Sequence, residues 1–266
     1  MLQNSRIIID SGYYFFYRFH ATKIWFKKSH QIDENDDITE NDDFVNMFKK
    51  KTASTIIDLS KKFKCPVKDI IFACDGARSN LWRTNSEHVE DYKGTRKNVA
   101  GIGKMIKIGY ETLRNMDISP RFISCHDAEA DDIIAVLSRK INKENPDFEI
   151  KIITSDKDLE QLCNDNICLH SLKNKFPKSI LKFDPKISLM IKIIGGDKSD
   201  NILPIANRLG KNKILSLAQS EEKLQEFLSN SSDEIKSRFE SNKKIIDLSL
   251  IPDDIQSRII EKYESN

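Results

Sequence analysis

The sequence predicts an α/β protein in which a mostly parallel central sheet is flanked by helices and followed by a helical C-terminal subdomain. Three observations favour this fold class. Short apolar runs alternate with longer amphipathic stretches up to Pro185, each apolar run ends beside a polar or turn-forming residue, and the strand signal disappears after Pro185. The chain has 266 residues, of which 39% are hydrophobic, so it can bury a sizeable core.

The elements can be placed in order along the chain. The expected strands are apolar runs bounded by polar residues, at 6–10, 69–75, 121–125 and 149–154. Amphipathic spacing predicts helices at about 43–63, which Pro66 stops, and from 129 through 141. Further helical patterns lie at 186–194, 211–218, 221–228, 233–239 and 252–263. We therefore expect an α/β core at 1–185 and a helical subdomain at 186–266.

The charged residues nearly balance, since 43 Lys and Arg face 41 Asp and Glu and give a net charge of +2. Any attraction to a polyanion must therefore come from how the charges are distributed. The sequence shows no apolar run of about 18 residues and no secretory leader, so we expect an intracellular protein without a membrane partner. Its 5 cysteines form no C-x-x-C pair and its 5 histidines lack zinc spacing, which predicts reduced thiols and no structural zinc.

Carboxylates fall where the expected strands end or where the following helix begins. They are Asp10 after the first strand, Asp75 after the second, Glu129, Asp131 and Asp132 after the third, and Asp156 and Asp158 after the fourth. The carboxyl ends of parallel strands meet at one edge of a sheet, where ligands bind, so we expect these side chains to converge. Asp197 and Asp200 form a further pair whose spacing suits one helical face.

Each of these acids has an ordinary structural explanation. Carboxylates complement the dipole in the first turn of a helix, and Asp-Gly is a good turn. The whole set is harder to explain in this way, because crowded carboxylates repel each other unless cations neutralise them. Oxygen-only ligands select hard ions, so the sequence predicts Mg²⁺, for which Mn²⁺ can substitute. Two such ions about 4 Å apart suit the hydrolysis of a phosphodiester.

A long basic segment at about 79–114 supplies groups that complement an anionic substrate. With Arg78 just before it, its cations are Arg83, Lys93, Arg96, Lys97, Lys104 and Lys107. Lys93 and Arg96 share a helical face and can hold a phosphate, while Tyr92 offers a ring on which a base can stack. Glycines weaken the helix, so we expect a mobile helical segment outside the core. The ordinary interpretation of such a segment is a solvated basic helix, but the expected anionic metal site nearby makes that interpretation less favoured.

Other classes of protein fit the sequence less well. A haloacid-dehalogenase-type phosphatase needs a second Asp two residues after its nucleophile, but Gly12 stands two residues after Asp10. A nucleotide-driven motor or kinase would need the first glycine and the final Ser or Thr that residues 101–105 lack. A structure-specific DNA-binding protein that has lost catalysis would lack some of the carboxylates that the metal site needs, and none is missing here. Incubation with a small phosphomonoester would identify the phosphatase.

Short motifs that occur in the same order resemble those of the flap endonuclease and 5′-nuclease family. They are Ile8-Ile-Asp10, Cys74-Asp-Gly76 with Trp82-Arg83, Tyr92-Lys-Gly-Thr-Arg96, Glu129-Ala-Asp-Asp132, Thr154-Ser-Asp-Lys-Asp158 and Gly196-Asp-Lys-Ser-Asp-Asn201. The resemblance spans about 6–218 and is greatest to the ribonuclease H subfamily of T-even phages, with a similar closing segment at 246–254. It implies a PIN-like fold and a metal-dependent 5′-to-3′ exonuclease or flap endonuclease with ribonuclease H activity, acting in DNA replication and repair.

The resemblance also implies roles for individual residues. The first metal cluster and its surroundings would comprise Asp10, Asp75, Glu129, Asp131 and Asp132, with Asp156 and Asp158 between or beside the ions and Asp197 and Asp200 at a second site. The residues implied as catalytic are Lys93, Arg96, Asp132 and Asp156, and the first two would lie on an arch at about 79–114. A helix–three-turn–helix element at 197–218 would grip duplex backbone without reading sequence. The implied DNA contacts are Arg78, Arg83, Tyr92, Lys93, Arg96, Lys97, Lys104, Arg208, Lys211 and Lys213.

The sequence departs from the family pattern in the hairpin of that element. A Gly-hydrophobic-Gly turn is usual there, but residues 205–211 read Ile-Ala-Asn-Arg-Leu-Gly-Lys, in which Arg208 can meet phosphate directly. A monovalent-cation site is accordingly in doubt, and we see no terminal clamp-binding motif. The expected partners of a monomer are branched or nicked duplex DNA and RNA–DNA hybrid, with a sliding clamp or single-strand-binding protein as further candidates. The expected location is the cytoplasm, or the host cytoplasm for a viral protein.

Overall fold

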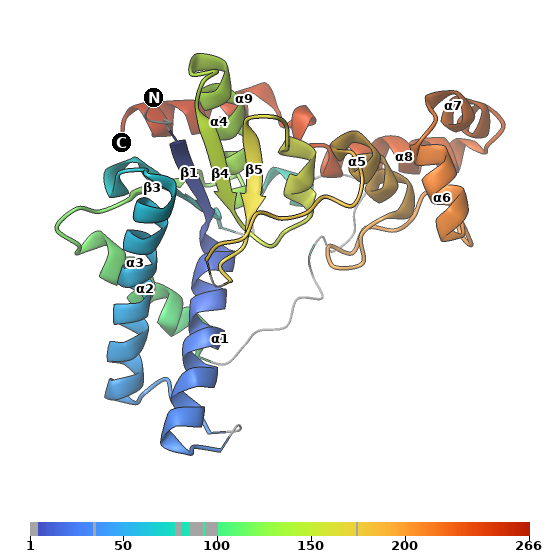
Figure 1. Ribbon diagram of the computed structural model, residues 1–266. Helices are drawn as coiled ribbons and strands as arrows, with labels where there is room; N and C mark the ends of the chain where they lie inside the picture. The colour runs from blue at the N-terminus through green and yellow to red at the C-terminus, as the bar shows by residue number, and fades with distance from the viewer. Residues whose placement is uncertain (1–4, 34–35, 78–80, 86–92, 94–100, 174) are drawn as a thin grey trace.

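A computed structural model describes the chain except for residues 1–4, 34–35, 78–80, 86–92, 94–100 and 174 (Figure 1). Its centre is a five-stranded sheet in the order β3-β2-β1-β4-β5, in which all neighbouring strands are parallel. The strands are β1 (Ser5–Asp10), β2 (Ile70–Cys74), β3 (Arg121–Ser124), β4 (Glu149–Ile153) and β5 (Ile167–His170). With helices on both faces of this sheet and a helical C-terminal region, the predicted fold class is confirmed.

The central position of β1 decides where the site forms. Ile7, Ile8 and Ile9 are completely buried, as expected for a strand covered on both faces, and Ile8 lies opposite Ile71 of β2 and Ile152 of β4. The chain leaves β1 toward β2 on one side, and β4 occupies the other side. The carboxyl end of β1, where Asp10 stands, is therefore the point at which the strand order reverses, and ligands of open α/β sheets bind at such a point.

Three helices pack together on one face of the sheet: α1 (Ser11–His30), α2 (Asp42–Phe63) and α3 (Ile102–Arg114) (Figure 1). The sequence pattern predicted α2 but not α1. In α1, Phe15 and Phe19 are buried whereas Phe16 and Trp25 are 45% and 57% exposed, so apolar side chains surround the helix and leave no clear apolar face.

At its C-terminal end the basic segment forms α3, which corrects the expectation of a mobile segment outside the core for residues 102–114; most of the expected arch at 79–101 lies outside the described residues. Met105 and Leu113 of α3 are completely buried in the same cluster as α1 and α2. The side chain of Phe15 on α1 lies against Gly109, where a Cβ atom would approach the Phe15 ring to 2.5 Å. The glycines were therefore a misleading signal, because Gly109 permits close helix packing rather than weakening the segment. Within the described ranges, every helix is too short or too polar to cross a bilayer.

The opposite face of the sheet is covered by α4 (Ala130–Glu144) and α9 (Asp253–Glu264). The C-terminal helices α5 (Pro185–Gly195), α6 (Lys211–Ala218), α7 (Glu221–Ser229) and α8 (Asp233–Ile246) share a separate apolar cluster. The region expected to be helical thus has two parts: α5 to α8 pack on one another, whereas the short helix η5 (Leu248–Leu250) and α9 return to the α/β core.

Candidate active site

A cavity of about 750 Å³ opens at the carboxyl edge of the sheet. Asp10 reaches it from β1, Asp75 from the end of β2, Asp131 from the first turn of α4 and Asp156 from the end of β4. A Cβ atom on Gly12 would lie 3.5 Å from Asp10 Oδ1 and 3.7 Å from Asp75 Oδ2, so both carboxylates lie close to this one small residue. The structure therefore brings together acids that are far apart in the sequence.

Asp10 is held by two elements at once. Its Oδ1 accepts a hydrogen bond from the Tyr13 backbone N–H at 3.0 Å and so caps α1, and its Oδ2 accepts from Thr154 Oγ1 at 3.0 Å. Burial raises the pKa of Asp10 to about 6; these hydrogen bonds oppose that rise, and the charges of Asp75 and Asp156 add to it. The carboxylate is thus fixed in position while its negative charge lacks compensation.

Asp131, like Asp10, is a buried carboxylate close to other acids. Burial raises its pKa well above the ordinary value, the charges of Asp156 and Asp10 raise it further, and Lys93 lowers it. Asp75 is fixed beside it, because Asp75 Oδ1 accepts the Ala130 backbone N–H at 2.8 Å. Carboxylates whose charges are unfavourable alone, in a site that offers only oxygen ligands, fit a hard divalent cation.

A tighter group of ligand atoms lies elsewhere in the described residues. Cys125, His126 and Asp127 each have a ligand atom within 4.8 Å of the others. Arg258 already binds Asp127, and these residues do not line the cavity. The cavity acids remain the better candidate for a metal centre because their charge has less compensation.

Lys93 faces the acids from the basic segment. Its Nζ donates to Glu129 Oε1 at 2.5 Å and lies 3.8 Å from Asp200 Oδ2. Its backbone N–H donates to the Asp200 carbonyl at 3.1 Å, and its φ of 56° is left-handed. A described part of the basic segment is thereby attached to the turn that follows α5, and its ammonium lines the cavity.

The second predicted acid pair lies in a turn and not on a helical face. Residues 197–201 form this turn after α5, which the Asp197–Ile202 bridge closes, and this corrects the expected helical placement of Asp197 and Asp200. Burial would raise the pKa of Asp197, but hydrogen bonds from Lys192 and Ser199 outweigh it and the pKa is lowered. Lys192 also pairs with Asp158 of the short helix η4 (Asp158–Leu162), so one ammonium joins two predicted metal ligands.

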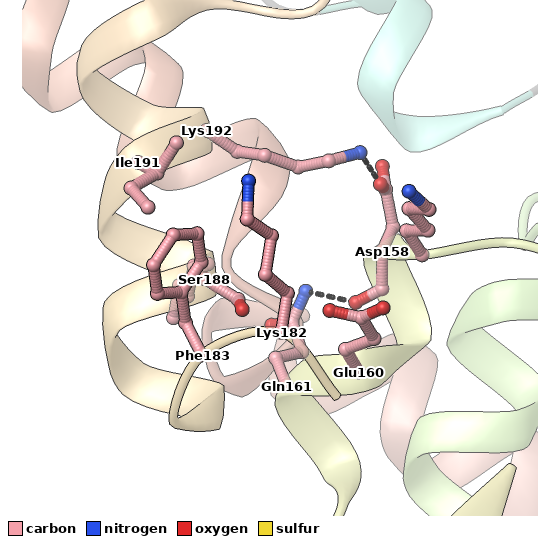
Figure 2. A pocket seen from close by; sticks show the side chains of 10 residues that line it. Asp158, Glu160, Gln161, Lys182, Phe183, Ser188, Ile191 and Lys192 are labelled. Carbon is pink, nitrogen blue, oxygen red and sulfur yellow. Dashed lines mark hydrogen bonds and ion pairs between the residues drawn. The ribbon is translucent and has the colours of Figure 1, made fainter. Parts of the chain in front are cut away.

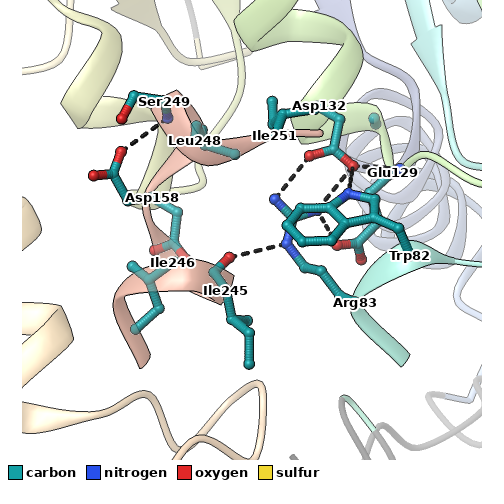
Figure 3. A network of polar contacts seen from close by, with 12 residues as sticks. Trp82, Arg83, Glu129, Asp132, Asp158, Ile245, Ile246, Leu248, Ser249 and Ile251 are labelled. Atoms are coloured by element: carbon teal, nitrogen blue, oxygen red, sulfur yellow. Dashed lines mark hydrogen bonds and ion pairs between the residues drawn. The ribbon is translucent and has the colours of Figure 1, made fainter. Parts of the chain in front are cut away.

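Arg83, which was predicted to contact DNA, has a side chain that is only 2% exposed and pairs with residues of the protein. It lies in the short helix η3 (Trp82–Asn85), and its Nη1 donates to Glu129 Oε2 at 3.0 Å. Its Nη2 lies 2.7 Å from Asp132 Oδ1, and its Nε donates to the Ile245 carbonyl of α8 at 2.9 Å (Figure 3). Arg83 therefore joins the start of α4 to the end of α8.

Asp132, which was predicted to be a metal ligand and a catalytic group, lies behind the first turn of α4 and not at the cavity. It is completely buried and accepts hydrogen bonds from Trp82 Nε1 at 3.0 Å, from Arg83, and from the Glu129 backbone N–H at 3.0 Å (Figure 3). The last of these bonds is half of a capping box with Glu129. Asp132 thus fixes the first turn of α4 from behind and does not line the cavity.

The remaining predicted DNA contacts fall into three groups. Arg208 and Lys211 lie at the loop and first residue of α6, and Lys213 follows with its Nζ over the Phe227 ring at 5.8 Å. Lys104 is on α3 and pairs with Glu40 at 2.5 Å. Outside the described residues lie Arg78, Tyr92, Arg96 and Lys97.

Two residues of the site had no predicted role. Thr154 links Asp10 to the loop after β4, since its Oγ1 donates to Asp10 and accepts the Asp156 backbone N–H at 3.0 Å. Lys192 was not predicted because the pattern at 186–194 indicates a helix through its apolar spacing alone. The signal was a lysine less than two turns before an expected metal ligand, Asp197.

Two family models and several known proteins match this chain. The family described as the 5′-3′ exonuclease N-terminal resolvase-like domain matches residues 5–186, and the family described as the T4 RNase H C-terminal domain matches 206–266. The ribonuclease H of Enterobacteria phage T4 is 28% identical over 225 residues, which are 74% of this chain and 70% of that protein. DNA polymerase I of Thermus thermophilus is 31% identical over 107 residues, 38% of this chain but only 12% of the polymerase.

Solved structures show the same fold. The T5 5′-exonuclease with bound divalent metal ions (zinc) aligns with a TM-score of 0.68 at 15% identity, over 98% of this chain and 99% of that one. The T5 D15 flap endonuclease in a pseudo-enzyme–product complex with DNA and metal ions gives 0.65 at 14% identity, over 98% of each chain. The resemblance to the ribonuclease H of T-even phages is confirmed by the two family matches and the T4 relative. The chain belongs to the 5′-3′ exonuclease family.

Proposed function

We propose that the protein is a divalent-metal-dependent 5′-to-3′ exonuclease and flap endonuclease that hydrolyses phosphodiesters in branched, nicked or RNA-primed duplexes during DNA replication and repair. One observation carries this proposal: Asp10, Asp75, Asp131 and Asp156 line a single cavity that Lys93 also lines. The named T5 relatives hold divalent metal ions, and one of them holds DNA, which supports the same ligands here.

The donor set fits Mg²⁺, with Mn²⁺ as a substitute, because it consists of carboxylate oxygens and because Asp10 and Asp131 are buried beside other acids. In this proposal Asp10, Asp75, Asp131 and Asp156 hold one ion, and Asp158, Asp197 and Asp200 contribute to a second. Such ions lower the pKa of water and neutralise charge on a phosphodiester.

The residues of the chain orient the substrate around this centre. Lys93 presents an ammonium at the cavity, where it can attract the scissile phosphate, and Glu129 holds that ammonium in place. Arg83 and Asp132 in turn hold Glu129, so the basic group depends on a buried network for its position. We assign Arg208, Lys211 and Lys213 to the duplex backbone, where contacts with phosphate give affinity without sequence preference.

The competing functions have less support. A haloacid-dehalogenase-type phosphatase would require its second aspartate two residues after Asp10, but Gly12 stands there, close to the Asp10 and Asp75 carboxylates. A DNA-binding protein without catalysis would not need to maintain several uncompensated carboxylates, which cost stability. Recruitment by a sliding clamp or single-strand-binding protein, and the monomeric state, stay predictions from the resemblance.

The test is a gel assay of a 5′-labelled flap, a nicked duplex and an RNA–DNA hybrid, each with Mg²⁺, with Mn²⁺ and with chelator. Asp156→Asn should lower cleavage about a hundredfold or more while DNA binding remains measurable, because it removes a ligand but not the duplex contacts. Asp165→Asn, which changes an exposed acid away from the cavity, should cleave normally. Cleavage that survives in chelator would contradict the proposal.

A further inference from the structure

Lys192 occupies the position that the proposed second metal ion needs. Its Nζ lies 2.8 Å from Asp197 Oδ2 and also pairs directly with Asp158 Oδ1. All three side chains are largely shielded from water, with exposed fractions of 26%, 15% and 20% for Lys192, Asp197 and Asp158. An ammonium and a divalent cation cannot share two carboxylates at this distance, because like charges repel strongly in a partly buried site.

A neighbouring cavity can accommodate the Lys192 side chain when it leaves the two carboxylates. A second cavity of about 220 Å³ lies between η4 and α5, and its wall shares Lys157 and Lys192 with the catalytic cavity. Figure 2 shows Lys192 reaching across from α5 to Asp158, with Glu160 on the η4 side of the same pocket. Glu160 is half-buried and makes no ion pair with any residue that the structure describes, so its carboxylate can accept the ammonium.

We propose that Lys192 is the resident cation of the second metal site: it neutralises Asp158 and Asp197 until a divalent ion displaces its ammonium into the adjoining cavity, where Glu160 receives it. This inference rests on the proposed function, which supplies the ion. Its consequence is a difference in affinity between the two sites. Among the residues that the structure describes, no ion pair joins a lysine to Asp10, and the printed partners of the Lys93 ammonium are Glu129 and Asp200. The second site should therefore be the weaker one.

The experiment is a calorimetric titration of the full chain with Mn²⁺ in the absence of DNA, with free Mn²⁺ followed by electron paramagnetic resonance. Asp197→Asn identifies the second site by removing the weaker binding event. Lys192→Met should tighten that event about fivefold, as expected from the loss of a competing, partly shielded ion pair. Lys186→Met is the matched control, because Lys186 is an exposed residue of α5 that does not line either cavity, and its binding should not change.

The role of Glu160 is tested by a double-mutant cycle. Glu160→Gln should weaken second-site binding about twofold to threefold in the wild-type background and should have no effect in the Lys192→Met background. Tighter binding in Lys192→Met with an equal effect of Glu160→Gln in both backgrounds would overturn Glu160 as the acceptor. If Lys192→Met does not fold, Glu160→Gln alone still decides the matter, since unchanged binding contradicts the proposal.

The failures of the two proposals are distinguishable. Second-site binding that is unchanged or weaker in Lys192→Met would show that Lys192 does not compete with the ion, and the nuclease proposal would stand. If the wild-type protein binds no Mn²⁺, or if Asp197→Asn leaves Mn²⁺ binding unchanged, the proposed second metal site is wrong and this inference is wrong with it.

Discussion

Removing the charge of Asp10 and removing the charge of Asp197 should change the stability of the folded protein in opposite directions. The pKa of Asp10 is raised to about 6, so between pH 4 and 6 the folded chain keeps a proton that the unfolded chain has lost, and metal-free stability falls as pH rises. The pKa of Asp197 is lowered, so its ionised form stabilises the fold above its ordinary pKa and that contribution is lost as pH falls.

We therefore expect Asp10→Asn to raise the melting temperature in chelator at pH 7 by about 2–5 °C, since Asn still caps α1. Asp197→Asn, its control of opposite sign, should lower the melting temperature. Differential scanning calorimetry at pH 5 and pH 7 measures both, and the pH dependence due to Asp10 should vanish in Asp10→Asn. A lower melting temperature for Asp10→Asn at pH 7 would mean that its charge is compensated in the fold.

Single residues also show how far the sequence predicts the site. Asp10 and Asp75 were predictable because a carboxylate at the end of a buried strand has only one edge of the sheet to face. The burial of Arg83 was not, because its partners Glu129 and Ile245 come from distant segments whose packing no local pattern reveals. A basic residue beside an expected site is thus as easily structural as functional.

Among the elements, α3 offers a sharp test of helix packing. A Cβ atom at Gly109 would meet the Phe15 ring at 2.5 Å, whereas one at Gly103 would meet nothing within 4 Å. Gly109→Ala should lower the free energy of unfolding by about 1–3 kcal/mol because it forces α3 away from α1. Gly103→Ala should be neutral or raise it by up to about 1 kcal/mol through helix propensity.

Urea denaturation followed by circular dichroism measures both glycine variants. Because Ile102 and Ile106 of α3 line the cavity of the candidate active site, we also expect Gly109→Ala to lower the proposed cleavage. Equal stability of the two variants would show that α3 is not packed as closely on α1 as the structure has it.

The elements that the sequence predicts differ from those that it does not in the strength of their local apolar pattern. The strands β1, β2 and β4 have strongly apolar runs, β3 has a short one formed by Phe122 and Ile123, and α2 and α4 have one apolar face each. The missed strand β5 is only four residues long and contains Cys168 and His170, which carry little strand signal. Tertiary packing completes such short elements, and no window of local sequence contains that contribution.

For the whole molecule, the return of α9 decides which parts unfold together. Ile259 is completely buried among residues of α4 and the sheet, although α5 to α8 precede it in the chain. Ile259→Ala should cost about 2–5 kcal/mol and should lower the hydrogen-exchange protection of α4 amides. Leu250→Ala, at a position that is 43% exposed, should cost less than about 1 kcal/mol. Reduced protection in α5 to α8 with unchanged α4 would place α9 in the helical unit instead.

The position of α9 also bears on how the protein is made. Translation produces α4 before α9. The apolar side of α4 that packs against α9 therefore stays exposed until residues 253–264 have been synthesised. The first turn of α4 carries Asp131, and the start of that helix is held through Arg83 by the end of α8. An unfinished polypeptide therefore lacks the contacts that hold the first turn of α4, and with it Asp131, in place.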